Sequence, residues 1–324
     1  MLVSVVLALA WFTVAFLSFR SAVKESNARV PDNVRAALSA SDGPALTSSR
    51  NILLVGTDKA KSREGLSDPG RSDSLIIVRV DPVHRRFSML SIPRDLQAEV
   101  PGEGTEKINS AYSIGGSALT VRTVKNLTNL PIHHYAEVNF DEFKTLIDEI
   151  GGVTVDVPKT IVTPPKDAEG SFDGVQWRFA KGEQKLNGRR ALAYARVRHN
   201  TRDPNESDLS RGRRQQQVID AIANRVVSFN SVLHPRKVPH AVVAPLTSDM
   251  AASTMMAMAF GKSWASQENT VRCRLGGDIG MVDGQSVIIG DGGENGAVIR
   301  MFLGKADPAK PKNLAANPFG PGCL

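Results

Sequence analysis

Two aspartates stand at the ends of apolar runs that predict strands. Asp58 ends the run Asn51-Ile-Leu-Leu-Val-Gly-Thr-Asp58, and Asp73 directly precedes the run Ser74-Leu-Ile-Ile-Val-Arg-Val80. If the two strands are neighbours, both carboxylates project from one edge of a sheet. Two hard oxygen ligands that leave positions open to water suit Mg²⁺, or alternatively Mn²⁺, shared with a phosphate group. A turn or cap role explains either aspartate alone, but their common placement favours a metal site.

Cations occur at the same kind of position. Arg71 lies two residues before Asp73, and Arg94 follows another apolar run within Ser91-Ile-Pro-Arg-Asp95. A guanidinium group matches two phosphate oxygens at once and keeps its proton. Lys107 is predicted to open a helix, whose free amide groups also favour an anion. Each cation alone would suit a solvated surface, but together they predict a site for a phosphate group.

The densest group of cations lies between residues 195 and 217. Arg196 and Arg198, two residues apart, are expected on one side of an extended segment. Farther along, Asp208, Arg211 and Gln215 recur at offsets of three and four, which places them on one face of a predicted helix. That face offers a carboxylate, a cation and an amide.

The neighbouring cations Arg213 and Arg214 fall on other faces of this helix and are expected in solvent or turned towards a membrane. A DNA-reading helix is the competing interpretation. The run has no helix-turn-helix companion, and Asp208 interrupts its cations. We therefore predict no nucleic-acid partner.

The elements that must position these residues alternate between strand and helix patterns. The runs 74–80 and 86–92 flank a turn at Asp81-Pro82, which predicts a hairpin. The sequence thus predicts a mixed α/β fold, with further helices at 108–114, 117–127, 140–150, 188–194 and 210–228 and a strand at 153–157. The chain beyond 231 still contains helix and strand patterns, whereas 307–324 is rich in Pro, Lys and Asn and is predicted to be disordered.

The first residues predict a membrane anchor. Residues 2–19 are apolar apart from three hydroxyl side chains, about the length that a helix needs to cross a bilayer. A cleaved signal peptide is the alternative, but no clear cleavage motif follows. The cations Arg20 and Lys24 follow the span, which is the reverse of the asymmetry expected for an outward-facing domain. The segment 21–50 is expected to form a stalk.

Composition restricts the partners. Forty Lys and Arg against 33 Asp and Glu give a net charge of +7, which suits DNA, an anionic membrane or a phosphorylated substrate. The two cysteines, Cys273 and Cys323, form no CxxC motif and lie near no histidine cluster, so a zinc site is not expected. The sequence leaves open whether they pair in an extracytoplasmic disulfide.

These motifs resemble the LytR-CpsA-Psr family, whose enzymes attach teichoic acids, capsular polysaccharide or arabinogalactan to peptidoglycan. The resemblance covers about residues 51–227. It is carried by Leu-Val-Gly-Thr-Asp58, Arg71-Ser-Asp-Ser74, Ser91-Ile-Pro-Arg-Asp95, Lys107-Ile-Asn-Ser-Ala-Tyr112, Ile150-Gly-Gly-Val153, Leu186-Asn-Gly188, Ala193-Tyr-Ala-Arg-Val-Arg198 and residues 208–216.

The resemblance implies a fold and a division of the chain. The expected fold is a three-layer α/β/α sandwich with a mixed central sheet and an apolar tunnel for a prenyl chain. The expected segments are a transmembrane anchor (1–20), an extracytoplasmic stalk (21–50), a catalytic domain (51–230), a partly folded C-terminal extension (231–306) and a disordered tail (307–324). The protein would lie in the cell membrane as a single-pass protein.

The resemblance also implies roles for particular residues. Asp58 and Asp73 match positions that hold Mg²⁺. The positions that contact the pyrophosphate of a polyprenyl lipid match Arg71, Arg94, Lys107, Arg196, Arg198, Arg211 and Gln215. Catalytic roles are expected for Arg94, Asp95 and Asp208, the two aspartates being the candidates for removing a proton from the acceptor. The segment between Arg198 and Asp208 is long, which loosens the match at Asp208.

The implied activity is a Mg²⁺-dependent phosphotransferase that moves an anionic glycopolymer from a polyprenyl-pyrophosphate carrier onto peptidoglycan. Such a transfer needs positioning and charge neutralisation, which suits an arginine-rich site without a catalytic triad. The alternatives are a pyrophosphatase acting on the same lipid and a membrane-bound transcriptional attenuator.

Overall fold

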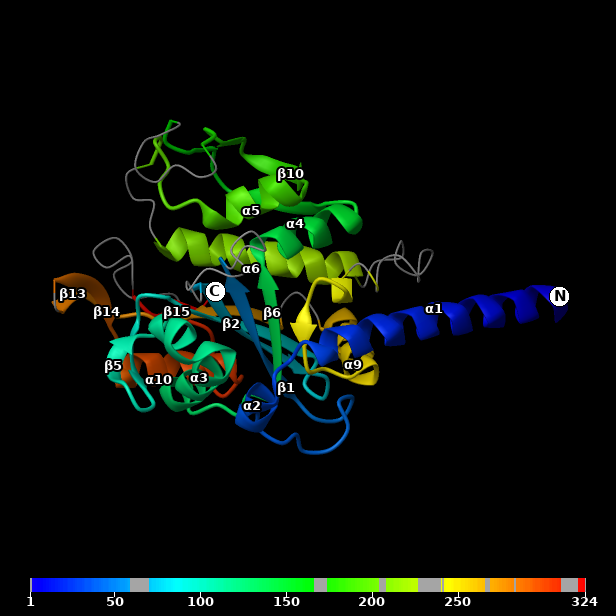
Figure 1. The fold of residues 1–324 in the computed structure, drawn as a ribbon. Helices are drawn as coiled ribbons and strands as arrows, with labels where there is room; N and C mark the ends of the chain where they lie inside the picture. Colours follow the sequence, from blue (N-terminus) through cyan, green and yellow to red (C-terminus); the bar gives the residue numbers. More distant parts are fainter. Residues whose placement is uncertain are drawn as a thin grey trace.

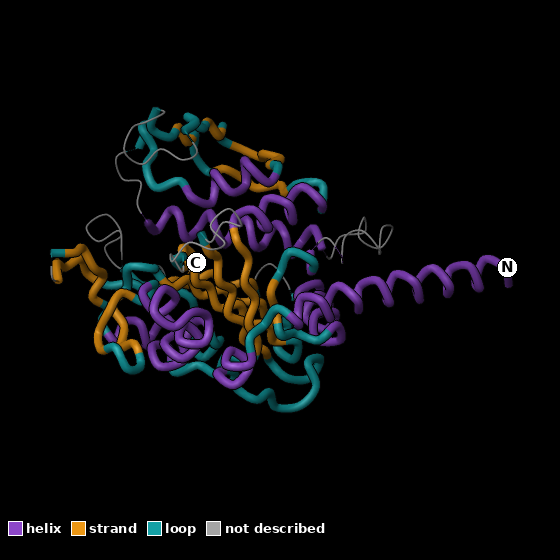
Figure 2. The backbone as a smooth tube through the Cα atoms, viewed as in Figure 1, coloured by secondary structure: helices purple, strands orange, loops and turns teal. Residues whose placement is uncertain are grey.

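A mixed seven-stranded sheet forms the centre of the computed structural model (Figures 1 and 2). The structure describes residues 2–58, 70–165, 174–203, 208–226, 240, 242–265, 269–282, 284–309 and 320–323. The strand order is β11-β6-β1-β2-β3-β12-β15. The strands are β1 (Arg50–Thr57), β2 (Ser72–Asp81), β3 (Arg86–Ile92), β6 (His134–Asn139), β11 (Thr247–Ser248), β12 (Thr270–Arg274) and β15 (Gly322–Cys323).

The sheet combines parallel and antiparallel pairs. Strand β1 is parallel to β6, and β3 is parallel to β12. The pairs β1/β2, β2/β3, β6/β11 and β12/β15 are antiparallel. The predicted hairpin is β2 and β3, and the predicted mixed α/β fold with a mixed central sheet is confirmed.

Helices cover both faces of the sheet. On one face, Leu75 and Ile77 of β2 share a core with residues of α3 (Ser110–Thr128) and α10 (Gly292–Phe302). On the other face, Ile76 and Val78 pack with residues of α6 (Asp208–Val226) and α9 (Ala252–Trp264). Because both faces are buried, the strands are continuous apolar runs rather than alternating ones.

A smaller lobe lies beyond α6, on the side away from α3 and α10 (Figure 1). It has its own apolar core. It consists of α4 (Phe140–Glu149), β7 (Val153–Val157), β8 (Ile161–Val162), β9 (Arg178–Phe179), β10 (Gly182–Leu186) and α5 (Gly188–Arg196). Strand β7 pairs with β10, and β8 pairs with β9. This lobe brings the cationic end of α5 over the sheet.

Two short hairpins and a kinked helix lie outside the smaller lobe (Figure 1). The hairpins are β4 (Gln97–Val100) with β5 (Gly104–Lys107) and β13 (Asp278–Val282) with β14 (Gln285–Ile289). The two helices predicted at 108–114 and 117–127 are the two halves of α3, which departs from helical geometry at Gly115 and Gly116. Gly116 has φ of 60°, which favours glycine.

Helix α1 (Leu2–Ala28) extends away from the rest of the protein (Figure 1). Its C-terminal part contacts the body, where Phe19, Ala22 and Val23 pack with Val243 and Ala252. Over the residues that the structure describes, no helix combines the length and apolarity needed to cross a membrane. The segment predicted as a stalk contains the end of α1 and a short helix, α2 (Asp32–Ala37).

The C-terminal region is part of the central sheet. Strand β12 lies beside β3, and a disulfide joins its residue Cys273 to Cys323 of β15. Both cysteines are 1% exposed. The disorder predicted for 307–324 therefore does not extend to residues 320–323, because the disulfide and the β12/β15 pairing hold them on the sheet.

We expect the disulfide to contribute to stability because it closes a loop of 50 residues in the unfolded chain. The double substitution Cys273→Ala and Cys323→Ala should lower the free energy of unfolding by about 2–4 kcal/mol, measured by denaturant titration in detergent. A reducing agent should destabilise the unsubstituted protein by a similar amount and leave the double variant unchanged. Equal stability of the two proteins under oxidising conditions would contradict this expectation.

Candidate functional site

The predicted site residues meet at one end of the central strands, where β1 and β3 end and β2 begins. Thr57 at the end of β1 is paired with Ser72 at the start of β2. Beyond this pair, the Asp58 amide donates to the Arg71 carbonyl at 3.2 Å, and the Arg71 amide donates to Asp58 Oδ1 at 2.7 Å. Strand register therefore brings Asp58, Arg71 and Asp73 together.

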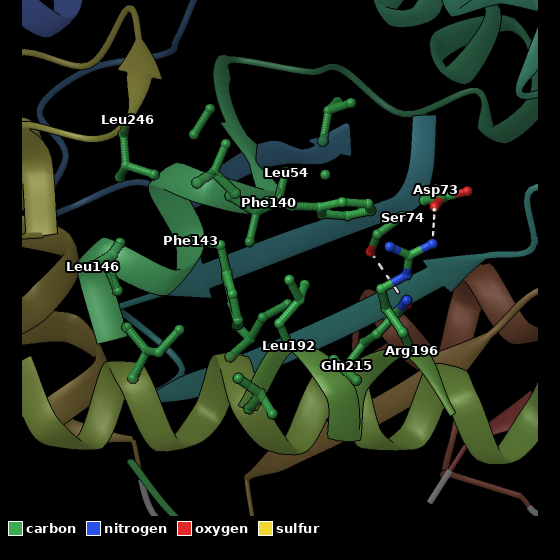
Figure 3. Close-up of a pocket in the computed structure, with 18 of the residues that line it drawn as sticks. Leu54, Asp73, Ser74, Phe140, Phe143, Leu146, Leu192, Arg196, Gln215 and Leu246 are labelled. Carbon is green, nitrogen blue, oxygen red and sulfur yellow. Dashed lines mark hydrogen bonds and ion pairs between the residues drawn. The ribbon is translucent and has the colours of Figure 1, made fainter. Parts of the chain in front are cut away.

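Asp73 is the centre of this group because two arginines contact its carboxylate. Arg94 Nη1 lies 2.9 Å from Asp73 Oδ1. Arg196 Nη2 lies 3.6 Å from Asp73 Oδ2 (Figure 3). Arg196 also stacks on the Phe140 ring, with its Cζ 4.3 Å from the ring centroid. One arginine comes from the loop after β3 and the other from the end of α5, so the site joins the sheet to the smaller lobe.

The charge of Arg196 depends on its neighbours. Burial lowers the pKa of Arg196, and the charges of Arg211 and Arg94 lower it further, whereas the carboxylates of Asp73 and Asp58 raise it. The effect of Arg211 on the pKa of Arg196 shows that Arg211 of α6 belongs to the same group of charges. Arg211 is only 5% exposed. The two aspartates therefore offset the mutual repulsion of closely placed cations.

Arg196 and Arg198 differ from the prediction of an extended segment. Arg196 is the last residue of α5, and Arg198 lies two residues beyond the end of this helix, where it is half-buried. The prediction was wrong because the helical pattern starting at Gly188 continues two residues farther than Tyr194. Only Arg196 of this pair has a described contact with Asp73.

Lys107 also differs from its predicted position at the start of a helix. It ends β5, and α3 begins three residues later at Ser110. Its Nζ lies 3.8 Å from Asp95 Oδ1, and Arg94 Nε lies 3.3 Å from Asp95 Oδ2. The hairpin of β4 and β5, which the sequence analysis missed, therefore directs Lys107 to the site.

Helix α6 provides the remaining candidates. Ser74 Oγ donates to Gln215 Oε1 at 3.2 Å, so Gln215 reaches the start of β2 (Figure 3). Asp208 is the first residue of α6, and its side chain lies outside the described residues. The structure thus brings together the predicted phosphate-site residues Arg71, Arg94, Lys107, Arg196, Arg211 and Gln215. Arg198 lies two residues after Arg196 in the chain.

An apolar cavity of about 220 Å³ opens from this site towards α6 and the smaller lobe. Its polar end consists of Asp73, Ser74, Arg196 and Gln215. The rest of its wall is apolar and includes Leu54, Phe140, Phe143, Leu146, Leu192 and Leu246 (Figure 3). The cavity can therefore hold a hydrocarbon chain whose charged end meets the arginines.

A polar cleft of about 310 Å³ lies on the other side of the Asp73–Arg94 ion pair. It is lined by Arg71, Arg94, Asp95, Glu106, Lys107, Asn109, Ser110, Ser113 and Gln285. Asp73 lines the apolar cavity and Arg94 lines the polar cleft, so their ion pair is the boundary between two chemically opposite spaces. This arrangement suits an amphipathic ligand with a charged group between a hydrocarbon and a polar part.

The sequence matches the LytR_cpsA_psr family over residues 13–300. The chain belongs to this family. Among curated relatives, it is 40% identical over 186 residues to the polyisoprenyl-teichoic acid–peptidoglycan teichoic acid transferase TagV of Bacillus subtilis (strain 168), covering 56% of this chain and 45% of that protein. The chain spans about half the length of the curated relatives it matches.

Solved structures of LytR-CpsA-Psr proteins share the fold. The crystal structure of B. subtilis TagV superposes with a TM-score of 0.66 at 30% identity, covering 80% of this chain and 97% of that one. A structure of TagT bound to LIIa-WTA superposes with a TM-score of 0.62 at 25% identity, covering 82% and 94% of the two chains. The similarity thus extends well beyond the 51–227 region where the motifs lie.

Two arginines of this LytR-CpsA-Psr protein are less exposed than the sequence predicted. Arg214 is 4% exposed, donates through Nη2 to the Val197 carbonyl at 2.6 Å and faces the Tyr194 ring. Arg213 is half-buried, and burial lowers its pKa. The prediction that both lie in solvent or face a membrane was wrong for Arg214, because α6 is covered by the sheet on one side and by the smaller lobe on the other (Figure 1).

The sequence also did not indicate a half-buried carboxylate near the site. Glu137 of β6 accepts hydrogen bonds from Tyr112 at 2.6 Å, from Ser117 at 2.9 Å and from Tyr135. Burial and the Glu137 charge raise the pKa of both tyrosines, so they remain donors. The group ties β6 to α3 beneath the site. Tyr135 lies on the same strand as Glu137, but nothing in the local pattern indicates Tyr112 and Ser117, because both belong to α3.

Proposed function

We propose that this protein is a phosphotransferase that moves an anionic glycopolymer from a polyprenyl-pyrophosphate carrier onto peptidoglycan. The observation that carries the proposal is the group of ion pairs at Asp73, which lies between an apolar cavity and a polar cleft. The polyisoprenyl-teichoic acid–peptidoglycan transferase TagV, a relative at 40% identity, supports the same reaction class.

The apolar cavity and the polar cleft suit different parts of the substrate. The prenyl chain enters the apolar cavity, where it is removed from water. Its pyrophosphate lies against the guanidinium groups of Arg94, Arg196 and Arg211, whose planar donors match phosphate oxygens. The glycan and the acceptor sugar occupy the polar cleft, which offers amide, hydroxyl and carboxylate groups. TagT, at 25% identity, was solved bound to LIIa-WTA, which agrees with a lipid-linked polymer as ligand.

The proposed reaction is a displacement at phosphorus. A hydroxyl group of peptidoglycan attacks the phosphorus atom beside the glycan and forms a P–O bond. The bond from that phosphorus to the bridging oxygen breaks, and polyprenyl phosphate leaves. The arginines neutralise the charge that develops on the phosphate oxygens. Asp95, which lines the polar cleft, is the candidate to accept the hydroxyl proton, with Asp208 as the alternative.

The carboxylates suit a shared metal ion. No cluster of three or more histidine, cysteine or acidic side chains that could hold a metal occurs in the described part of the chain. Asp58 and Asp73 flank one strand pair at the site, so they would hold Mg²⁺, or Mn²⁺, together with phosphate oxygens and water. When bound, the ion adds positive charge beside the pyrophosphate.

We further propose that α1 anchors the protein in the cell membrane as a single span with the catalytic region outside the cell. The apolar run at residues 2–19 supports the anchor. The disulfide Cys273–Cys323 supports an oxidising, extracytoplasmic location. An anchored enzyme would meet a carrier that is itself dissolved in the bilayer.

Two other functions make different predictions. A pyrophosphatase would use the same site with water as the acceptor, so analysis of the products separates it from a transferase. A transcriptional attenuator would need a DNA-binding surface, for which α6 was the candidate. Arg211 and Arg214 of α6 are at most 5% exposed, and buried guanidinium groups cannot contact a DNA backbone.

The first test removes the pyrophosphate contacts. Arg94→Ala and Arg196→Ala should each lower the rate of transfer from a synthetic lipid-linked glycan to peptidoglycan by about 10²–10³-fold, as for other lost charge-stabilising donors. Mass analysis of the wall fragments measures the product. Arg122→Ala, on the exposed side of α3, is the matched control and should keep full activity. Undiminished transfer by both site variants would rule out this site.

The second test concerns the metal ion. Chelation of divalent cations should abolish transfer, and added Mg²⁺ should restore it. Asp58→Asn should raise the Mg²⁺ concentration needed for half-maximal activity, because one anionic ligand is lost. The control Asp32→Asn, on the exposed surface of α2, should leave that concentration unchanged. Transfer that persists in excess chelator would contradict a metal requirement.

The third test fills the apolar cavity. Ile222→Trp places a larger side chain in the cavity wall, where overpacking costs about 1–3 kcal/mol. We expect the KM for a long-chain polyprenyl substrate to rise by about tenfold, in line with that cost, and the KM for a short-chain analogue to change little. Ile222→Val is the control, and circular dichroism checks that the variant is folded. An equal effect on both substrates would argue against the cavity as the prenyl site.

A further inference from the structure

Helix α9 has its largest apolar side chains on the outside. Met256, Phe260 and Trp264 are 51%, 47% and 53% exposed and follow one another at intervals of four residues. That spacing places them in one row along the helix. The rings of Phe260 and Trp264 lie with their centroids 4.6 Å apart. The three side chains therefore form one apolar stripe, which we call the α9 stripe.

The inner face of α9 has the opposite character. Its buried residues are Ala252, Ala257 and Gly261. A Cβ atom at Gly261 would lie 2.7 Å from Val80 Cγ1, so the helix packs closely on β2. A surface helix normally turns its large apolar residues inwards. Packing against the sheet therefore accounts for the small residues of α9 and leaves the stripe unexplained.

The exposed side of α9 carries no charged residue. The exposed residues of the helix are the three of the stripe together with Ser253 and Ser263. Its one charged residue, Lys262, turns inwards: its side chain is 11% exposed, and its Nζ lies 3.0 Å from Asp220 Oδ1. This surface thus differs from the normal mixed surface of a water-exposed helix.

The stripe continues towards α1. Ala252 and Met255 at the start of α9 pack with Phe19 and Val23 of α1, and Figure 1 shows α9 beside the part of α1 that meets the body. Farther along α1, Phe16 and Leu17 are 45% and 56% exposed. The apolar surface of α9 is therefore continuous with the helix that we propose as the membrane anchor.

Cations border this apolar surface. Arg20 and Lys24 are exposed on α1. At the other end of α9, Arg85 Nε donates to the Trp264 carbonyl at 3.1 Å. Tryptophan and phenylalanine at a bilayer boundary, with basic residues beside them, are typical of surfaces that lie on anionic membranes.

We propose that the α9 stripe lies in the interfacial region of an anionic lipid bilayer and sets the orientation of the catalytic region on the membrane. The inference rests on the proposed anchoring by α1. Three apolar side chains enter the lipid headgroup region, and Arg20, Lys24 and Arg85 contact anionic headgroups. The helix then holds the protein at a second point, so the body cannot swing freely about α1.

This orientation would bring the prenyl cavity close to the bilayer. Met258 of α9 packs against the same apolar cluster as Leu54 and Ile219, and both of these residues line the apolar cavity. The cavity wall and the membrane-facing helix therefore share one apolar cluster. A carrier lipid leaving the bilayer beside α9 would expose little of its chain to water.

The test uses the full chain in vesicles of phosphatidylcholine and phosphatidylglycerol, with bromine on the acyl chains of part of the lipid. One variant keeps only Trp264, through Trp11→Phe and Trp177→Phe, and a second keeps only Trp177, which is 8% exposed in the smaller lobe. Bromine should quench the emission of Trp264 and leave that of Trp177 almost unchanged. Equal quenching of the two residues, in protein that floats with the vesicles, would overturn the inference.

A second comparison excludes a loss of folding. In the Trp264 reporter, Met256→Ser with Phe260→Ser should reduce quenching towards the Trp177 level. Ile279→Ser is the matched control, because Ile279 is 56% exposed on the distant hairpin of β13 and β14, and it should change nothing. Protein that does not float with vesicles would refute the anchoring itself. Self-association that the double substitution abolishes, without quenching of Trp264, would show that a second copy covers the stripe and would overturn the lipid assignment.

Discussion

The contact of one carboxylate with two guanidinium groups makes the site possible. Arg94, Arg196 and Arg211 lie close enough for their charges to oppose one another, and burial strengthens such repulsion. Asp73 bridges the first two at 2.9 and 3.6 Å. The cations are thus held in place before a ligand arrives. In the proposed function, a pyrophosphate group would take over their neutralisation, so its binding would exchange ion pairs and need little rearrangement of the protein.

The strand pattern explains why these groups meet. Because β2 is antiparallel to β1 and β3, the end of β1, the start of β2 and the end of β3 lie on the same side of the sheet, at one end of the strands. Asp58, Asp73 and Arg94 occupy these positions. The smaller lobe adds Arg196 from above the same edge, and an apolar cavity lies between lobe and sheet. One arrangement of layers thus supplies the charged group and the space for hydrocarbon.

Local sequence patterns predicted the parts of the fold that depend on neighbours in the chain. The β2/β3 hairpin, helix α4 and the break in α3 at Gly115 are examples, as is the gathering of aspartates and arginines at strand ends. Partners far apart in the chain were not predictable in this way. Strand β12 pairs with β3 although the two strands are about 180 residues apart in the chain. Glu137 of β6 accepts hydrogen bonds from Tyr112 and Ser117 of α3. Arg214 was misplaced for the same reason, since its carbonyl partner at Val197 precedes the helix.

The site also explains why arginine rather than lysine occupies its interior. Arg196 stacks on Phe140 and is partly desolvated, which lowers its pKa. The ordinary pKa of a guanidinium group lies so far above neutrality that the group tolerates such a decrease and remains charged at neutral pH. An ammonium group starts lower and loses its proton more readily when buried. It would also lack the planar surface that stacks on a ring. Lys107 lies instead in the polar cleft beside Asp95. The two cations thus differ in their surroundings, because Arg196 lies against an aromatic ring and Lys107 lies among polar groups.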